Sequence, residues 1–266
     1  MGKYREVTSE LLKLVQQRKT GKEISSILNL DYSTVHKKLR KLGINLHNYH
    51  NELKFNNKVF DSIDTEEKAY WLGFLYADGS VSARDNQVEL SLASVDREHL
   101  QKFKEFLESK NEVKLSNSRC NGKIYQRCRF NATDKHFHDR LIELGCVPRK
   151  SLILKFPDKS IFKNTKLIKD FIRGYIDGDG CLTYTKTGRL VIEIVGTKEF
   201  LDGIINYFSQ FFVGKTAKKD KRNTNNTCSI SCSCDKADKL ATILYEDAAI
   251  YLDRKYNRFA VLRRNS

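Results

Sequence analysis

The 266-residue sequence has few features of membrane-bound or secreted proteins. No apolar run approaches the roughly 20 residues that cross a bilayer, and the first residues lack the apolar core of a signal peptide. Seven cysteines are an odd number for a disulfide framework, so we expect reduced thiols. Two prolines beside many lysines and asparagines suit an AT-rich genome. We therefore expect a soluble protein in the cytoplasm of a bacterial or phage-infected cell, with an organelle as the alternative.

Negative charge is also scarce. There are 33 Asp and Glu residues against 48 Lys and Arg, so the net charge is 48 − 33 = +15, and the pI is about 9.4. A balance this basic favours a polyanionic partner, of which nucleic acid is the commonest, and a merely lysine-rich protein is the alternative. The length allows two or three modest hydrophobic cores.

Residues 1–47 have the pattern of a small helix-turn-helix DNA-binding module. They carry ten basic and four acidic residues, a net charge of 10 − 4 = +6. Apolar periodicity predicts three helices, with Thr20 and Glu23 as a capping box on the second and Gly43 ending the third. A basic helical bundle that contacts protein is the alternative. The expected buried residues are Leu11, Leu12, Leu14, Val15, Ile24, Ile27, Leu28, Val35, Leu39 and Leu42. The third-helix candidates for DNA contact are Thr34, His36 and Lys37.

The rest of the chain divides into a linker and two similar halves. Residues 48–60 lack clear periodicity and predict the linker. Residues 61–156 and 167–266 each have the order α-β-β-α-β-β-α followed by a basic tail, and residues 157–166 join them. We therefore expect an α+β fold, in which an αββαββα unit is duplicated about a pseudo-twofold axis and builds two antiparallel four-stranded sheets. The small all-α module is added to this core.

Period-two alternation gives each expected sheet one apolar and one polar face. Val88, Leu90 and Leu92 share a face that helices can cover, while Arg, Asn, Gln, Ser and Thr gather on the other. Such side chains hydrogen-bond base edges and phosphates, so we expect the polar faces to contact DNA, and a solvated sheet face is the alternative. The candidates are Ser80, Ser82, Arg84, Asn86, Gln87, Glu89, Arg127, Arg129 and Asn131 in the first half, and Thr183, Thr185, Arg189, Glu193, Ser229 and Ser231 in the second.

Three cysteines near the C-terminus have the spacing of a C-x3-C-x-C metal cluster. Cys228, Cys232 and Cys234 also share one face of an expected strand with Ile230. We therefore favour buried core cysteines over zinc ligands.

Each half begins with an apolar helix that ends in Asp-Gly, first in YWLGFLYADG and then in FIRGYIDGDG. Small residues one turn apart give each helix a flat strip on which another helix can approach closely. If the two strips pack together, the helices run side by side about the pseudo-twofold axis. The strip residues are Gly73, Ala77, Gly174 and Gly178.

This packing would bring Asp78 and Asp179 together at the ends of the two helices. The carboxylates repel each other, and each lies at the negative end of a helix dipole, so a cation would offset both costs. Oxygen ligands suit Mg²⁺ rather than zinc, and we expect Mn²⁺ to substitute. Two such acids between two basic sheets suit metal-dependent phosphodiester cleavage, with one acid for each strand of a duplex.

The segments WLGFLYADG (71–79) and IRGYIDGDG (172–180) resemble two copies of the LAGLIDADG motif. Residues 65–266 resemble a single-chain, pseudo-dimeric LAGLIDADG homing endonuclease. The resemblance implies a DNA-binding saddle and Mg²⁺-dependent cleavage of both strands of a long asymmetric site, with short 3′ overhangs. It also implies intron homing by a mobile genetic element. It makes Asp78 and Asp179 metal ligands, helped by the backbone carbonyls of Ala77 and Gly178.

The same resemblance implies a basic residue that organises active-site water after the last helix of each repeat. The segments PRKS and DRKY match it with Lys150 and Lys255, and phosphate-contacting tail lysines are the alternative. Ser94 and Thr197 are further candidates for assisting the reaction. Tyr76 occupies the position where the motif often has its first Asp, and Asp177 occupies the same position in the second copy. We expect the protein to be active despite the difference at Tyr76.

Three functions are compatible with this pattern. The first is a DNA endonuclease that binds double-stranded DNA as a monomer, without a membrane or a protein partner. The second is a maturase that acts on intron RNA through the same fold. The third is a non-catalytic regulator, since some bacterial regulators join a degenerate LAGLIDADG core to a helix-turn-helix. Both Asp78 and Asp179 are present, which argues against the third function and leaves the second open.

Overall fold

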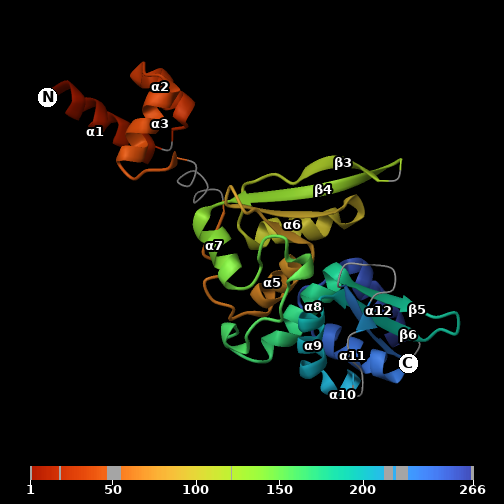
Figure 1. Ribbon diagram of the computed structural model, residues 1–266. Helices are drawn as coiled ribbons and strands as arrows, with labels where there is room; N and C mark the ends of the chain where they lie inside the picture. The colour runs from red at the N-terminus through yellow and green to blue at the C-terminus, as the bar shows by residue number, and fades with distance from the viewer. Residues whose placement is uncertain are drawn as a thin grey trace.

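The structure is a computed structural model, and it describes residues 2–17, 19–46, 55–120, 122–212, 218–219 and 227–264. Figure 1 shows a group of N-terminal helices and two mixed units, whose first helices α5 and α8 lie at the centre. Within these described ranges, no helix is long and apolar enough to cross a membrane.

The N-terminal group consists of α1 (Gly2–Gln16), α2 (Gly21–Leu28) and α3 (Tyr32–Lys41). The capping box is present, because the Thr20 side chain accepts from the Glu23 amide while the Glu23 carboxylate accepts from the Thr20 amide at 2.7 Å. Gly43 follows α3 with φ +73°, a conformation that glycine adopts without strain. The group has its own small apolar core, separate from that of the two repeats.

Three residues expected in this small core lie on its surface instead. Leu12, Ile27 and Leu42 are 37%, 52% and 43% exposed. Each helix has few turns, and three helices alone bury only a narrow stripe, so the outer members of each apolar run stay in water. The other seven are buried or packed against the core.

The first repeat is built on a four-stranded antiparallel sheet of order β1-β2-β4-β3. Its elements are α5 (Glu66–Asp78), β1 (Gly79–Val81), β2 (Gln87–Ala93), α6 (Arg97–Phe106), β3 (Lys114–Cys120), β4 (Lys123–Thr133) and α7 (Lys135–Glu143). Figure 1 shows the β3–β4 hairpin extending from this unit.

The second repeat has the corresponding sheet, of order β5-β6-β8-β7, so the duplicated α+β fold with two antiparallel four-stranded sheets is confirmed. Its elements are α8 (Leu167–Asp179), β5 (Gly180–Tyr184), β6 (Leu190–Gly196), α9 (Lys198–Tyr207), α10 (Ser209–Phe212), β7 (Lys218–Lys219), β8 (Cys228–Ser233), α11 (Asp235–Tyr245) and α12 (Asp253–Arg264). The basic tail expected after α11 forms a further helix, α12, in the second repeat.

The predicted linker is wrong at its C-terminal end. Residues 47–54 lie outside the described part of the chain. Phe55, Val59 and Phe60 are buried at 4%, 7% and 1% exposure in the main core, where Phe55 and Phe60 pack against the ring of Phe137. Three large apolar residues in six positions mark a packed segment, and the absence of regular periodicity concealed it.

The cysteine assignment is correct for two of the three residues. Cys228 and Cys232 are buried on β8 among the core residues. Cys234 lies beyond the strand, is half-buried, and has φ 56° at the residue before α11. The strand ends one residue earlier than the alternation predicted, so Cys234 does not share its face.

The interface between α5 and α8 brings backbone against backbone. A Cβ atom added to Gly73 would lie 1.9 Å from the carbonyl oxygen of Phe171, and one added to Gly174 would lie 2.0 Å from that of Tyr70. These two contacts are reciprocal, because 73 and 174, like 70 and 171, differ by 101 residues. Reciprocal contacts are the mark of a twofold interface, here within one chain.

Gly73→Ala should destabilise the protein strongly, because neither backbone can move away from the new methyl group without separating the helices. Overpacking of this kind costs about 1–3 kcal/mol or more. Ala77→Gly on the same helix is the matched control, since it removes a methyl group from the interface and should cost about 1 kcal/mol of helix propensity. Urea unfolding measures both, and equal losses would contradict this account of the interface.

Candidate functional site

The C-terminal ends of α5 and α8 bring the two predicted acids into one place. The strips that precede them meet, since a Cβ atom added to Gly178 would lie 2.3 Å from the Ala77 Cβ and 3.2 Å from Asp78 Oδ2. Both aspartate residues are exposed to solvent at the rim of this contact. The next residues, Gly79 and Gly180, begin β1 and β5, so each carboxylate stands at the junction of a central helix and a sheet.

The two carboxylates lie in a partly desolvated site, and each is harder to ionise than usual. Burial, then the neighbouring Asp179 charge, raises the pKa of Asp78 to about 6. Burial also raises the pKa of Asp179, while Lys150 and Lys255 act in the opposite direction. Although solvent reaches both carboxylates, the protein on the remaining sides limits their hydration.

Lys255 occupies the second half of the site as a buried cation. It is 3% exposed, and its Nζ donates to the carbonyl oxygens of Ile176 (2.5 Å), Asp177 (2.7 Å) and Gly180 (2.6 Å), with Gly178 at 3.3 Å. Burial lowers the pKa of Lys255 to about 8, an effect that the nearby Asp177 and Asp78 charges oppose. The ammonium group therefore caps the C-terminus of α8, where cations are favoured.

Lys150 holds the corresponding place in the first half, with fewer contacts. Its Nζ donates to the carbonyl oxygen of Gly79, the counterpart of Gly180. The side chain is half-buried rather than enclosed. The two lysines thus mark equivalent positions in two halves that differ in detail.

The donors at this site suit a hard divalent cation. The described residues hold no group of three or more His, Cys, Asp or Glu side chains that could bind a metal ion. Two carboxylates whose pKa values are raised, beside backbone carbonyls, form an oxygen-only set that is incomplete without water or substrate. Mg²⁺ is commonly bound in this way, by one or two carboxylates together with water and phosphate oxygen.

Asp78 opens onto the polar face of the first sheet. A hollow of about 290 Å³ is lined by Asp78 together with predicted and additional residues of β1 to β4. Strand register explains the grouping, because Ser80 pairs with Glu89 and Glu89 pairs with Asn131 across three strands. The lining residues are Asp78, Ser80, Glu89, Ser91, Ser116, Asn117, Ser118, Arg127 and Arg129.

Two predicted residues on this face are engaged with each other and with their neighbours. Arg129 forms an ion pair with Glu89 at 3.3 Å. With its amide group in the orientation that satisfies its surroundings, Asn131 donates to Glu89 and accepts from Gln87, both at 3.1 Å. Gln87, Glu89 and Asn131 therefore form a connected polar row at the β2–β4 pair.

The second sheet presents a similar row beside Asp179. Glu193 pairs with Cys181 on one side and Ser231 on the other, and Thr183 and Ser229 lie on the same face. Cys181 takes the position of Ser80, two residues after the aspartate, and Lys218 pairs with Ser229 at the edge.

Five predicted contact residues lie in turns rather than on strands. Ser82, Arg84 and Asn86 belong to the β1–β2 turn, because β1 ends at Val81 and Asn86 has φ 51°. Thr185 and Arg189 close the β5–β6 turn, where the Thr185 amide donates to the Arg189 carbonyl at 2.9 Å. The period-two alternation predicted both strands to be longer than they are, because turn residues can continue the pattern by chance.

The three α3 candidates differ in accessibility. Lys37 is exposed, whereas Thr34 and His36 are half-buried. The His36 ring lies 4.3 Å from that of Tyr32, and its Nε2 is enclosed without a hydrogen-bond partner. Nε2 of His36 is therefore not presented to a ligand in this conformation.

Two lining residues, Asn117 and Ser118, were missed because the sequence pattern ended β3 at Ser116. The strand continues to Cys120, which adds Asn117 and Ser118 to the hollow. The alternation of Lys114, Ser116 and Ser118 was the available signal. Thr197, a further candidate, lies elsewhere, since it is 2% exposed and caps α9 by accepting from the Phe200 amide.

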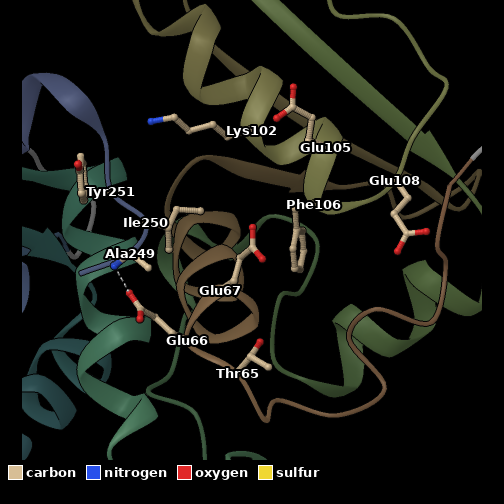
Figure 2. A pocket seen from close by; sticks show the side chains of 10 residues that line it. All are labelled: Thr65, Glu66, Glu67, Lys102, Glu105, Phe106, Glu108, Ala249, Ile250 and Tyr251. Atoms are coloured by element: carbon tan, nitrogen blue, oxygen red, sulfur yellow. Dashed lines mark hydrogen bonds between the residues drawn. The ribbon is translucent and has the colours of Figure 1, made fainter. Parts of the chain in front are cut away.

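A larger hollow of about 830 Å³ lies at the opposite end of α5 (Figure 2). It is lined by four glutamates, among them Glu66 and Glu67 at the start of the helix, whereas Asp78 ends it. Twelve residues at 1.5 Å each separate Glu66 from Asp78, about 18 Å along the axis. Its acidic lining is unsuited to a polyanion, so the site at Asp78 and Asp179 is the better candidate despite its smaller hollow.

Comparison with known proteins bears on the fold of the core. Residues 65–131, within the first repeat, match the sequence model of the LAGLIDADG-like domain. No curated protein matches the chain at a significant level. The homing endonuclease I-WcaI bound to its DNA recognition sequence is similar with a TM-score of 0.55 at 13% identity, covering 73% of this chain and 87% of that one.

Two further solved structures show weaker likeness. The I-LtrWI LAGLIDADG homing endonuclease bound to target DNA gives a TM-score of 0.45 at 15% identity, with 74% and 90% of the two chains covered. Full-length DUF199/WhiA from Thermatoga maritima gives 0.44 at 15% identity, with 79% and 67% covered. At such identities likeness establishes the fold alone, and the core has the LAGLIDADG homing endonuclease fold.

The raised pKa of Asp78 predicts a pH-dependent gain in stability for Asp78→Asn. Between pH 3.8 and about 6, the folded protein binds a proton that the unfolded chain lacks, so stability falls as pH rises through this window. Above it, the ionised carboxylate destabilises the metal-free fold. The variant should therefore unfold at a higher temperature than the natural chain at pH 7.5, and the difference should vanish near pH 4.

Calorimetry in the presence of a chelator measures this effect. Asp85→Asn is the matched control, because Asp85 is an exposed turn residue and should give no such difference. An equal or lower unfolding temperature for Asp78→Asn at pH 7.5 would contradict the electrostatic account of the site.

Proposed function

We propose that this protein is a site-specific DNA endonuclease of the LAGLIDADG homing type. It hydrolyses one phosphodiester bond on each strand of a long asymmetric duplex and leaves short 3′ overhangs. The observation that supports this most is the pair of carboxylates, one from each repeat, at the end of a glycine-packed interface and open to a polar sheet face. In this proposal the protein acts as a monomer in the cytoplasm of its host, as part of a mobile intron or a free-standing element.

Asp78 and Asp179 hold the divalent cation in this proposal, with the backbone carbonyls of Ala77 and Gly178 as further oxygen ligands. Mg²⁺ is the proposed ion, and Mn²⁺ substitutes for it. A bound ion of this kind supplies an activated water and stabilises the leaving 3′ oxygen. The two acids come from different repeats, so each repeat serves one strand.

Lys150 and Lys255 orient water and offset charge at the scissile phosphates. Both lie within the electrostatic reach of Asp179, whose pKa they lower. An ammonium group between a carboxylate and a phosphate also limits the repulsion between enzyme and substrate.

The polar faces of the two sheets contact the duplex, with arginines on phosphates and amide groups on base edges. The net charge of +15 supports a polyanionic substrate. The module of α1 to α3 adds contacts outside the region that the sheets cover, through Lys37 and its basic neighbours on α3.

The first test is cleavage of a plasmid library of candidate sites with Mg²⁺. Asp78→Asn should reduce the rate of double-strand cleavage by more than about 100-fold, while DNA affinity stays the same. Removing a residue that only hydrogen-bonds a metal ligand typically costs less than this. Asp85→Asn should cut like the natural chain. Double-strand breaks by Asp78→Asn at the natural rate would refute the assignment of this carboxylate.

Failure of the natural chain to cut any site, with specific duplex binding retained, would instead indicate a regulator. Specific binding to a structured intron RNA without DNA cleavage would indicate a maturase.

The second test concerns residues 1–47, whose core is separate from that of the repeats. Their removal should weaken binding, increase cleavage at related sites and leave cleavage itself intact. The slope of log affinity against log salt should shrink by about 0.9 for each phosphate that the shortened chain no longer neutralises. Lys37→Gln in the full-length chain should remove one phosphate contact and so reduce this slope by about 0.9. Unchanged affinity after the deletion would show that the module contacts something other than DNA.

A further inference from the structure

Asp177 is a fully buried carboxylate that the proposed reaction does not use. Its Oδ2 accepts from the Tyr70 hydroxyl at 2.8 Å and from the Leu252 amide at 2.7 Å, and its Oδ1 accepts from the Tyr245 hydroxyl at 2.7 Å. Three donors satisfy a carboxylate where water cannot reach. One donor, Tyr70, comes from α5 of the first repeat, so the cluster connects the two repeats.

His99 extends this cluster and fixes its hydrogen-bond directions. The Tyr70 hydroxyl lies 3.0 Å from His99 Nε2 and has one proton, which it donates to Asp177. His99 must therefore carry its proton on Nε2 and donate to the Tyr70 oxygen. The chain of donors runs from His99 through Tyr70 to Asp177.

The segment that Asp177 holds, residues 246–252, is tied at several other points. The amide of Ala249 donates to Glu66 Oε1 at 2.8 Å, drawn as a dashed line in Figure 2, and the carbonyl of Ile250 accepts from Arg173 at 3.0 Å. Arg173 also binds Glu66 at 2.7 Å. Side chains of both central helices therefore fix this loop.

The first turn of α12 continues directly from the loop and docks on the first repeat. Asp253 pairs with Lys102 at 2.9 Å, and Arg254 places its Nε 3.0 and 3.1 Å from the two carboxylate oxygens of Asp96. Lys255 is the next residue, three positions after Leu252. A hydrogen bond at Leu252 therefore acts one helical turn from the lysine.

The first repeat lacks this arrangement. Tyr76 takes the place of Asp177 and donates to the carbonyl oxygen of Leu144, six residues before Lys150. Lys150 is half-buried and contacts the Gly79 carbonyl, whereas Lys255 is enclosed by carbonyls. The half with the buried aspartate is the half with the tightly held lysine.

We propose that Asp177 is a positioning residue, which fixes the start of α12 through the Leu252 amide and so holds Lys255 at the carbonyls around Asp179. The expected effect on cleavage rests on the proposed nuclease function. One of the two strand cuts depends on Asp177, and the other does not. In the first half, the Tyr76 hydroxyl reaches a carbonyl six residues before Lys150, whereas Asp177 accepts from an amide three residues before Lys255.

Asp177→Asn keeps the shape of the side chain but replaces the carboxylate with an amide. The amide N–H cannot accept a hydrogen bond from the three donors, and the amide oxygen is a weaker acceptor than a carboxylate oxygen. Cleavage of a supercoiled plasmid should then pass through nicked circles, with one strand cut at the natural rate and the other slowed about 10–100-fold, as for an outer partner at a metal site. Separate end labels on the two strands measure this. Tyr76→Phe is the matched control and should produce no nicked circles. Equal slowing of both strands, or no slowing, would overturn the proposal.

A double-mutant cycle with Lys255→Met tests the route of the effect. If Asp177 acts through Lys255, adding Asp177→Asn to Lys255→Met should slow the affected strand no further. Full additivity would overturn the proposal.

Hydrogen exchange provides a readout that needs no cleavage. The amides of residues 246–258 should exchange faster in Asp177→Asn, while those of 144–152 stay unchanged. Unchanged exchange at 246–258 would overturn the proposal, even if the natural chain cut no DNA and the proposed function itself failed. Should Asp177→Asn not fold, Tyr245→Phe removes one of the three donors and should show the same direction in both assays.

Discussion

The close contact between α5 and α8 determines the rest of the core. At Gly73 and Gly174 the two backbones meet without side chains between them, so the distance between the helices is fixed by peptide groups rather than by rotamers. Each helix continues through its aspartate into the first strand of a sheet. The same contact therefore sets the separation of Asp78 from Asp179 and the relation of both to the polar sheet faces.

This geometry has an electrostatic cost that the surroundings offset only in part. Two acids at helix C-termini lie where negative charge is least favoured, and burial raises the pKa of both. Lys150 and Lys255 donate to the carbonyls beside them rather than to the carboxylates themselves. The lysines thus neutralise the helix ends and leave the carboxylate oxygens available, which is the condition an incoming cation needs.

Much of the fold followed from the sequence, because glycine spacing and period-two alternation report on backbone contact and burial. The two Asp-ended helices and the two sheets were visible in this way. Strand ends were less certain, since Ser82 and Thr185 continued an alternation into turns and Ser118 belongs to a strand that the pattern ended too early. The cluster around Asp177 was not visible, because Tyr70, His99, Tyr245 and Leu252 are scattered through the chain and only tertiary packing brings them together.

The ion pair between Arg173 and Glu66 has a consequence for assembly. The twofold counterpart of Arg173 is Leu72, and that of Glu66 is Leu167, so the pair exists only where unlike repeats meet. Two second repeats from different molecules would set the buried guanidinium against leucine, and two first repeats would leave the glutamate without its cation. Arg173 would keep its ion pair with Asp170 at 2.7 Å, and the Glu66 side chain is partly exposed, so each like pairing loses one ion pair without leaving a buried charge unpaired. The interface therefore favours the pairing of unlike repeats over the pairing of like repeats, whether the two repeats belong to one chain or to two.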